Sequence, residues 1–597
     1  MINRQAILHK PLSQYSYSTA EYCLTIRLRA AKNNLCSCIL HYGNRVDLTP
    51  LDQFRTLKME KIASDDYFDY YESNISSDLD RVCYYFEMQD ADERLYLCAD
   101  TIATDFPKDR TEVYQFPFIR REEISDVPHW LKEAVVYNIF PDSFADSKRG
   151  ISCTAKDYFD EKTGQTLHTR LGGTIRGIIE NLDYIEDLGF NCLYLNPIFT
   201  AAEYHRYDLL DYYHVCPNLG TDDDFRELVS EVHSRGMHII IDGVFNHSSW
   251  YFFAFDDVVK NGENSRYKDW FYGLKFPVVR PEDGERPNYT CFAYERKMPK
   301  LNTSNPKVRD YFMDVCRYWL EDFDVDGWRL DVANEVDKDF WRAFRAVAKK
   351  TKKDSVLIAE IWENSERWLQ GDMFDSTMNY EFRKVCRDFF AFGKINAREF
   401  NSRFVDMLLR YPFPIVQGQL NLLDSHDVSR FRSLCAQNSA DSGDSSAVDK
   451  RFRLAELCLL TSVGTPSVFY GDELGIVGFE ECDYRAPMPW ANPVKDNRDL
   501  FRELIKLRRS NDCFIHGNFR VLDYDDRGKF VFARSTDSKR VVVALNAFNE
   551  SNDSFSALPD CEPIISYNYD AQNHALGAFG YAIFEVKWRF NGDLMAI

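Results

Sequence analysis

Eight short runs of apolar and β-branched residues, spaced by stretches of helical period, are the feature that most restricts the fold of this chain. The stretch Thr174–Leu188 precedes the second run, and Phe225–Arg235 precedes the third and closes at Gly236, as helices often do. Strands that alternate with helices form parallel sheets, and eight such units predict a (β/α)8 barrel, the TIM-barrel architecture of the α/β class. The expected strands are Val135–Ile139, Cys192–Leu195, His238–Asp242, Gly327–Asp331, Val356–Glu360, Phe374–Met378, Gln419–Leu422 and Ser467–Phe469.

The segments on either side of the expected barrel have a different pattern. Residues 1–122 contain bursts in which apolar and polar positions alternate, which predicts an N-terminal β-sandwich. The barrel is expected at 123–510, with a small subdomain inserted after its third strand at about 246–305, because that connection is long for a βα loop. Residues 511–597 return to β-type alternation and predict a C-terminal β-sandwich domain. The stretch Gln437–Ser446, rich in Ser, Asp, Ala and Gly, predicts a flexible surface loop.

Charge, cysteine usage and hydropathy limit the class of protein. The formal net charge is −21 without a local basic stripe, so a nucleic-acid partner is not expected. The 16 Cys are scattered, with neither paired metal-binding spacing nor a compact disulfide framework, which favours a reducing compartment. The sequence has no pattern of a secretory leader and no run approaching about 18 apolar residues. We therefore expect a soluble, cytoplasmic protein with no membrane partner.

Acidic residues stand at the ends of the expected barrel strands. Asp242, Asp331 and Glu360 each end a different strand, and Asp427 follows shortly after another. A single acid in this position is often only a helix N-cap. The carboxyl ends of all eight strands of such a barrel meet on one rim, where barrel enzymes assemble their sites. The four acids together therefore indicate an active site.

The neighbours of these acids carry a family pattern. In chain order the blocks are Asp242-Gly-Val-Phe-Asn246-His247, Gly327-Trp-Arg329-Leu-Asp331, Glu360-Ile-Trp362 and His426-Asp427. Together they resemble the α-amylase superfamily, glycoside hydrolase family 13. Two further blocks, Met298-Pro-Lys-Leu-Asn302 and Val332-Ala-Asn334-Glu335, are similar to its neopullulanase, cyclomaltodextrinase and maltogenic amylase subgroup. That subgroup typically has an N-terminal β domain like a carbohydrate-binding module, so the resemblance covers nearly the whole chain and is weakest after about residue 510.

The resemblance implies catalytic roles for three acids. It assigns Asp331 as the nucleophile, Glu360 as the acid/base and Asp427 as a third acid that holds the sugar hydroxyls. The retaining route of glycoside cleavage uses one ionised carboxylate and one protonated carboxyl about 5 Å apart. Arg329 lies two residues before Asp331, so on a strand both side chains point to one face. We expect Arg329 to keep Asp331 ionised and Glu360 to lie where its pKa is raised.

Other residues of these blocks are expected to bind the sugar. His247 and His426 could be satisfied histidines of the core, but their place beside the family blocks favours donors to sugar hydroxyls. Tyr207 is similar to the family's stacking aromatic, and Arg485 to a residue that grips the next sugar. Glu481 stands where the subgroup usually has Asp, which leaves the preference of that subsite open. The remaining expected substrate-binding residues are Asp242, Asn246, Arg329, Asn334, Glu335 and Trp362.

The resemblance implies a retaining hydrolase that cleaves α-1,4-glucosidic bonds, with α-1,6 bonds as a further candidate, in cyclomaltodextrins, pullulan and maltooligosaccharides. One alternative is an α-glucan transglycosylase, because a sugar can capture the same covalent intermediate. A non-catalytic barrel homologue and an α-glucosidase acting on chain ends are weaker alternatives, since all three acids are present and the Met298–Asn302 block points to the subgroup. The subgroup also implies a homodimer in which the N-terminal sandwich of one subunit narrows the partner's cleft.

A cofactor is not expected. Many members of the subgroup hold calcium with a loop after the first barrel strand and an Asp after a Gly-Gly pair. Here the loop Phe144–Gly150 offers Asp146 beside Lys148 and Arg149, and Thr174 follows the glycines. Calcium needs six to eight oxygen ligands, and two nearby cations oppose it. We expect this site to be degraded and predict no metal ligands, with calcium at another site left open.

Overall fold

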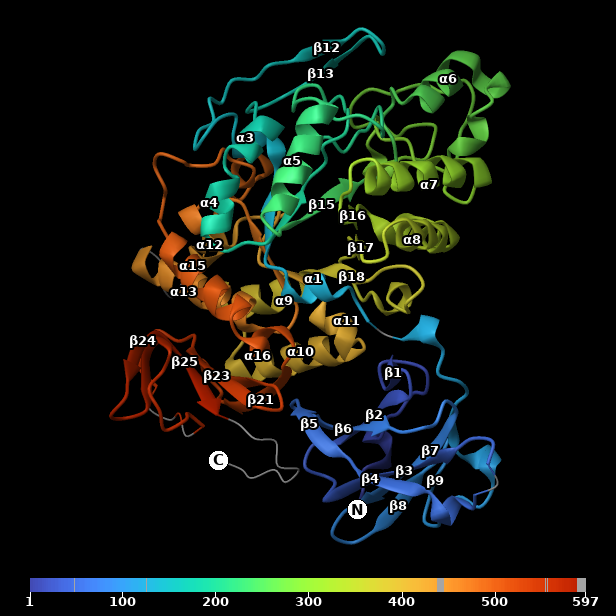
Figure 1. The fold of residues 1–597 in the computed structure, drawn as a ribbon, viewed down its shortest axis with the longest axis vertical. Helices are drawn as coiled ribbons and strands as arrows, with labels where there is room; N and C mark the ends of the chain where they lie inside the picture. The colour runs from blue at the N-terminus through green and yellow to red at the C-terminus, as the bar shows by residue number, and fades with distance from the viewer. Residues whose placement is uncertain (48, 125, 438–444, 553–554, 556, 588–597) are drawn as a thin grey trace.

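The computed structural model describes all residues except 48, 125, 438–444, 553–554, 556 and 588–597. The chain passes through an N-terminal β domain, a central barrel with its helices, and a C-terminal sheet (Figure 1). Most of the surface loop predicted at 437–446 lies outside the described residues. Among the residues described, we find no helix with the length and apolar character needed to span a membrane.

The N-terminal domain is a β-sandwich, as predicted. Its two antiparallel sheets enclose a hydrophobic core of their own, separate from that of the barrel. The first sheet has the order β1 (Ser16–Ala20), β2 (Cys23–Ala31), β6 (Phe68–Ser76), β5 (Glu60–Ser64). The second has the order β4 (Arg55–Lys58), β3 (Ser37–Asn44), β7 (Val82–Gln89), β8 (Arg94–Leu97), β9 (Ile102–Ala103), and β10 (Tyr114–Phe116) also pairs with β7.

Eight parallel strands close the barrel, and each predicted strand is present within a few residues of its expected bounds. Nearly every side chain of these strands is buried, because the barrel interior covers one face and the helices cover the other. In order around the barrel they are β11 (Val136–Ile139), β14 (Cys192–Leu195), β15 (His238–Gly243), β16 (Gly327–Leu330), β17 (Val356–Ala359), β18 (Ser376–Asn379), β19 (Leu420–Leu422) and β20 (Thr465–Phe469).

The helices follow the alternation expected from the sequence. The main ones are α1 (His129–Glu133), α2 (Pro141–Phe144), α5 (Asp222–Ser234), α7 (Pro306–Glu321), α8 (Lys338–Thr351), α9 (Tyr380–Cys386), α10 (Ala397–Leu409), α11 (Phe413–Gln417), α12 (Phe431–Cys435), α13 (Ser445–Thr461), α14 (Glu481–Tyr484), α15 (Arg498–Arg509) and α16 (Asp512–Ile515). The inserted subdomain contains α6 (Phe253–Asn261) and lies beside α7 (Figure 1). A small hairpin of β12 (Tyr158–Asp160) and β13 (Gln165–Leu167) precedes α3 (Ile175–Ile179).

The expectation of one helix over 174–188 was wrong in one respect. Two short helices are present, α3 (Ile175–Ile179) and α4 (Leu182–Asp187), with a break at Asn181. The Asn181 side chain donates to the carbonyls of Gly177 and Ser147 and accepts from the Arg149 amide. These side-chain bonds compete with the helical backbone bonds, which explains the break.

The C-terminal domain is a β domain, but its described residues form one antiparallel sheet rather than a sandwich. The order is β21 (Asn518–Tyr524), β22 (Lys529–Ser535), β23 (Lys539–Asn546), β25 (Ala575–Lys587), β24 (Ile565–Asp570). Phe530 and Phe532 on one face join the barrel core, while Val531 on the other face packs with Phe555 and Leu558. The barrel and a connecting loop thus cover both faces, a role that the sequence interpretation had given to a second sheet.

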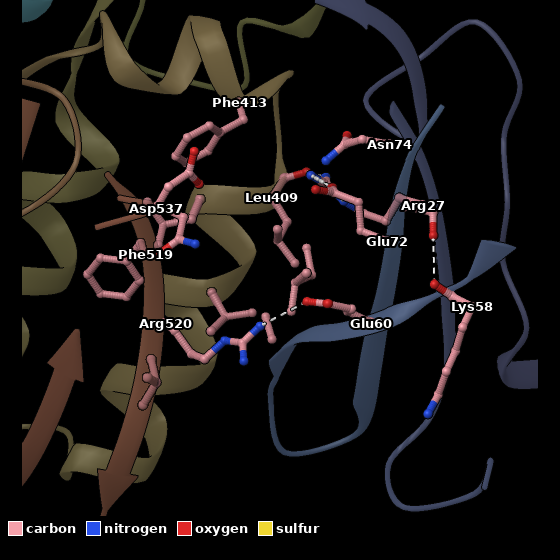
Figure 2. A pocket seen from close by; sticks show the side chains of 17 residues that line it. Arg27, Lys58, Glu60, Glu72, Asn74, Leu409, Phe413, Phe519, Arg520 and Asp537 are labelled. Carbon is pink, nitrogen blue, oxygen red and sulfur yellow. Dashed lines mark hydrogen bonds and ion pairs between the residues drawn. The ribbon is translucent and has the colours of Figure 1, made fainter. Parts of the chain in front are cut away.

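The N-terminal domain contacts the rest of the chain at α10 and β21. A cavity of about 450 Å³ lies at this junction. Arg27 and Glu72 lie on one side of it and Phe519 and Arg520 on the other (Figure 2). The buried Arg27 pairs with Glu72 at 2.8 Å and donates to the carbonyl of Leu409 at 3.1 Å. A charge-assisted bond to a backbone carbonyl thus holds this domain on α10.

Candidate active site

Arg329 is the centre of the predicted site. Its side chain is fully buried within β16, and its Nη1 lies 2.9 Å from Asp242 Oδ1 and 2.8 Å from Asp331 Oδ1. Its Nη2 lies 2.9 Å from Glu360 Oε2 and 4.0 Å from Asp427 Oδ2. Asp242 is the last residue but one of β15, while Asp331 and Glu360 immediately follow β16 and β17. Closure of the barrel therefore gathers four acids, distant in sequence, around one guanidinium.

Two further bonds hold the Glu360 carboxylate. The Val332 amide donates to Glu360 Oε2 at 3.0 Å, and the Trp362 indole donates to Glu360 Oε1 at 3.0 Å. Val332 has a φ of 44°, a left-handed conformation that is costly for a β-branched residue. Val332 directly follows Asp331, and this backbone conformation directs its amide towards Glu360. Trp362 itself stacks on Tyr380 with ring centroids 4.3 Å apart.

The acids differ in their electrostatic environment. Burial raises the pKa of Asp331 well above its usual range; Arg329 opposes this, but the charges of Glu360 and Asp242 add to it. Arg329 acts on Asp331 in the expected direction, towards the ionised form, while burial and the neighbouring carboxylates act against it. For Asp427, burial would raise the pKa, but His426, Arg329 and Arg485 outweigh burial and lower it. The surroundings thus raise the pKa of Asp331 and lower that of Asp427.

Asp427 lies between two positioned groups. His426 Nε2 is 3.0 Å from Asp427 Oδ2, and Arg485 Nη2 is 3.5 Å from Asp427 Oδ1. Arg485 also donates to the His426 carbonyl and pairs with Glu481 at 2.6 Å. Glu481 accepts a further bond from the Tyr204 hydroxyl. The departure at Glu481 therefore keeps an acid that orients Arg485 at the edge of the site.

The predicted aromatic Tyr207 is part of the network behind the acids. Its hydroxyl donates to Asp242 Oδ2 at 2.9 Å and contacts His426 Nε2, and its ring stacks parallel to His426 at 5.3 Å. His247 Nε2 donates to the Tyr207 carbonyl at 3.1 Å. Burial lowers the pKa of His247 to about 3, so its ring is neutral near pH 7. His247 and His426 both use their ring nitrogens within the chain and position Tyr207.

A cavity of about 470 Å³ opens over these groups and separates the expected residues into two sets. Asp242, Arg329 and His426 are fully buried and do not line the cavity, so they support the groups that do. Asn246 is also buried and, with Glu335, holds the ammonium group of Lys300. The expected residues that line the cavity are Tyr207, His247, Asp331, Asn334, Glu360, Trp362, Asp427, Glu481 and Arg485.

Several residues of the site were missed from the sequence. His205, Phe292 and Met298 also line the cavity, and Phe292 stacks on His247 at 5.0 Å. The signal for His205 was its place two residues before Tyr207, and Met298 belongs to the block that indicated the subgroup. Behind the acids, the Tyr194 hydroxyl donates to Asp242 at 2.8 Å. Nothing in the local sequence distinguishes Tyr194 from an ordinary core residue.

The loop of residues 144–150, considered above for calcium, is held by donors of the chain itself. Asp146 accepts bonds from the Ser147 hydroxyl at 3.0 Å and from the Ser152 amide at 2.9 Å. The Asn181 side chain donates to the Ser147 carbonyl at 2.9 Å. The oxygens that could face a cation are thus engaged in hydrogen bonds, a pattern that does not fit a calcium cage.

Comparison with known proteins agrees with this geometry. Residues 138–540 match the family model described as the α-amylase catalytic domain, and residues 1–120 match the α-amylase N-terminal Ig-like domain. The chain is 39% identical to neopullulanase 2 of Thermoactinomyces vulgaris, over 93% of each chain. It is 35% identical to an intracellular maltogenic amylase of Bacillus subtilis, over 92% of this chain and 91% of that one. The solved structure of a cyclomaltodextrinase superposes with a TM-score of 0.84 at 33% identity, over 92% of both chains.

Proposed function

The chain belongs to the α-amylase family, and from this premise we propose that it is a retaining glycoside hydrolase that cleaves α-1,4-glucosidic bonds in cyclomaltodextrins, pullulan and maltooligosaccharides. One observation supports this most strongly. Asp331 and Glu360 contact neighbouring nitrogens of the same guanidinium, so the two carboxyl groups lie close together at the floor of one cavity. A close pair of carboxyl groups suits the retaining route, in which no water has to fit between acid and nucleophile.

The surroundings of each acid suit a distinct step. Glu360, held by Val332 and Trp362, protonates the oxygen of the leaving sugar as the bond to the anomeric carbon breaks. Asp331, as its carboxylate, bonds to that carbon as the glycosidic bond breaks, which gives a covalent glycosyl-enzyme intermediate. Water, deprotonated by Glu360, releases the sugar from Asp331 in the second step. Asp427, kept ionised by His426 and Arg485, accepts bonds from sugar hydroxyls.

The anomeric configuration of the first product tests the mechanism. We expect the first product from each substrate to have the α configuration, measured by NMR before mutarotation. A product of β configuration would exclude the retaining route. A product profile on cyclomaltodextrins, pullulan and starch at equal enzyme concentration tests the substrate class. Longer oligosaccharides that appear only at high acceptor concentration would favour the transglycosylase alternative.

We propose that the enzyme needs no calcium in the loop 144–150, because Asp146 is already bonded to Ser147 and Ser152. Treatment with a chelator should leave the activity unchanged within error. Added calcium should then have no effect, with a known calcium-dependent amylase treated in parallel as the control. A large loss that calcium restores would show that a calcium site exists.

We propose a homodimer in which the N-terminal domain of one subunit narrows the cleft of the other. The cavity that holds the acids is lined by residues from 205 onward, while the N-terminal domain of the same chain packs on α10. Its other surfaces are therefore available to a second copy. Light scattering should give twice the mass of the chain, and removal of residues 1–122 should lower the mass and raise starch activity relative to cyclomaltodextrin activity. An unchanged substrate ratio in a folded monomer would contradict the proposal.

We also propose a cytoplasmic location, which the intracellular relative and the free state of all 16 cysteines support. Cell fractionation with a periplasmic and a cytoplasmic marker enzyme would test it.

A further inference from the structure

A cluster of metal-ligating side chains lies far from the acids, at the junction of the barrel with the C-terminal domain. His129, Glu133 and His516 each offer a ligand atom, and these atoms all lie within 4.8 Å of one another. The three side chains come from two segments, α1 before the first barrel strand and the residue that follows α16.

The spacing of His129 and Glu133 suits joint ligation. Side chains four residues apart lie on the same face of a helix. His129 Nδ1 is already 3.3 Å from Glu133 Oε1, about the separation of two ligand atoms on one zinc ion. The two side chains are 70% and 46% exposed, so they can adjust their rotamers without disturbing the core.

His516 completes the cluster from the other segment. Its ring lies 5.1 Å from that of His129, at an interplanar angle of 37°. Within the part of the chain that the structure describes, no side chain or carbonyl forms a hydrogen bond with a His516 ring nitrogen. Its backbone is fixed, since its amide donates to Asp512 and its carbonyl accepts from Gln417.

We propose that His129, Glu133 and His516 form a binding site for a transition-metal dication such as zinc. Two imidazoles and one carboxylate are a common ligand set for zinc, and solvent can occupy the fourth position. Two imidazole nitrogens and only one carboxylate make calcium or magnesium, which prefer several oxygen ligands, poor occupants.

The position of the cluster indicates a structural role. α1 leads into β11 at the start of the barrel, and the Leu131 carbonyl of α1 accepts a bond from Thr465, the first residue of β20. The cluster is therefore at the N-terminal face, opposite the rim that holds Asp331 and Glu360. A metal there joins the first and last segments of the barrel, and a link that closes a long loop restricts the unfolded chain.

Titration of the chelator-treated full-length protein with Co²⁺ and Zn²⁺ tests the proposal. We expect one equivalent of Co²⁺ to give visible d–d absorption bands that Zn²⁺ abolishes. Zinc at about 100 times its Kd should raise the melting temperature by about 3 °C. Turnover should be unchanged, because the site lies at the opposite end of the barrel.

The variants His129→Ala and His516→Ala should each weaken Co²⁺ binding by at least about tenfold and remove the thermal shift. Glu133→Gln keeps both imidazoles and should weaken binding to a smaller extent. His214→Ala is the matched control, because His214 is an exposed histidine paired with Asp211 elsewhere on the barrel. Cobalt bands that persist in both histidine variants, or the lack of zinc binding in the unmodified protein, would overturn the proposal. Since all three side chains are exposed, circular dichroism should show that the variants fold normally.

Discussion

The variants Asp331→Asn and Glu360→Gln are each expected to lose nearly all hydrolysis, with kcat reduced by at least about 10²- to 10⁴-fold. Asn cannot form the covalent bond to the sugar, and Gln cannot supply the proton to the leaving oxygen. Both changes preserve the size of the side chain and the contact with Arg329. Initial rates on cyclomaltodextrin and pullulan, measured with matched protein concentration, give the comparison.

The stability of these variants separates a catalytic role from a structural one. Burial raises the pKa of Asp331 in the folded protein, so ionisation of this acid at neutral pH opposes folding. Replacement of Asp331 by the neutral Asn should therefore leave the melting temperature equal to that of the unmodified protein or raise it. Asp339→Asn is a suitable control, since Asp339 is 71% exposed and pairs with Arg342 outside the cavity. Near-normal turnover by folded Asp331→Asn or Glu360→Gln would refute the assignment.

The barrel could be predicted from the sequence because its signal is local. Each strand is a short apolar run, and a parallel strand buried on both faces needs no alternation. The acids followed from the same reasoning, since Asp331 and Glu360 stand directly after such runs. The break at Asn181 was missed because it depends on a bond between its side chain and Ser147, more than thirty residues away.

The support behind the acids could be predicted only in part. Arg329 was predicted because side chains two residues apart on a strand point to the same face, which places Arg329 beside Asp331. Tyr194 was not, because its hydroxyl meets Asp242 only when neighbouring strands align in the closed barrel. Glu335 was expected at a sugar subsite, and in the free site its carboxylate pairs with Lys300 at 3.0 Å. A side chain this exposed has several possible partners, and sequence alone does not rank them.

Arg329→Met is expected to have the second large effect, on both stability and activity. The guanidinium is fully buried, and its removal would leave Asp242 and Asp331 without their cation. Loss of one partner from a buried ion pair typically costs about 3–5 kcal/mol in the free energy of unfolding. Chemical denaturation at neutral pH would measure this change. Arg329→Lys should recover part of the stability, because an ammonium group keeps the charge but cannot contact both sets of oxygens.

A buried arginine outside the cavity provides the control for Arg329. Arg430 is also fully buried and pairs with Asp472 at 3.0 Å. Arg430→Met should destabilise the fold to a similar extent, while the folded fraction keeps most of its turnover. In Arg329→Met the folded fraction should instead show a large fall in kcat with a small change in KM, because Arg329 positions Asp331 and Glu360 and does not line the cavity. The pH profile of kcat should shift too, since the carboxylates would bind protons more tightly without their cation. Equal losses of kcat in the two methionine variants would mean that Arg329 contributes only to folding.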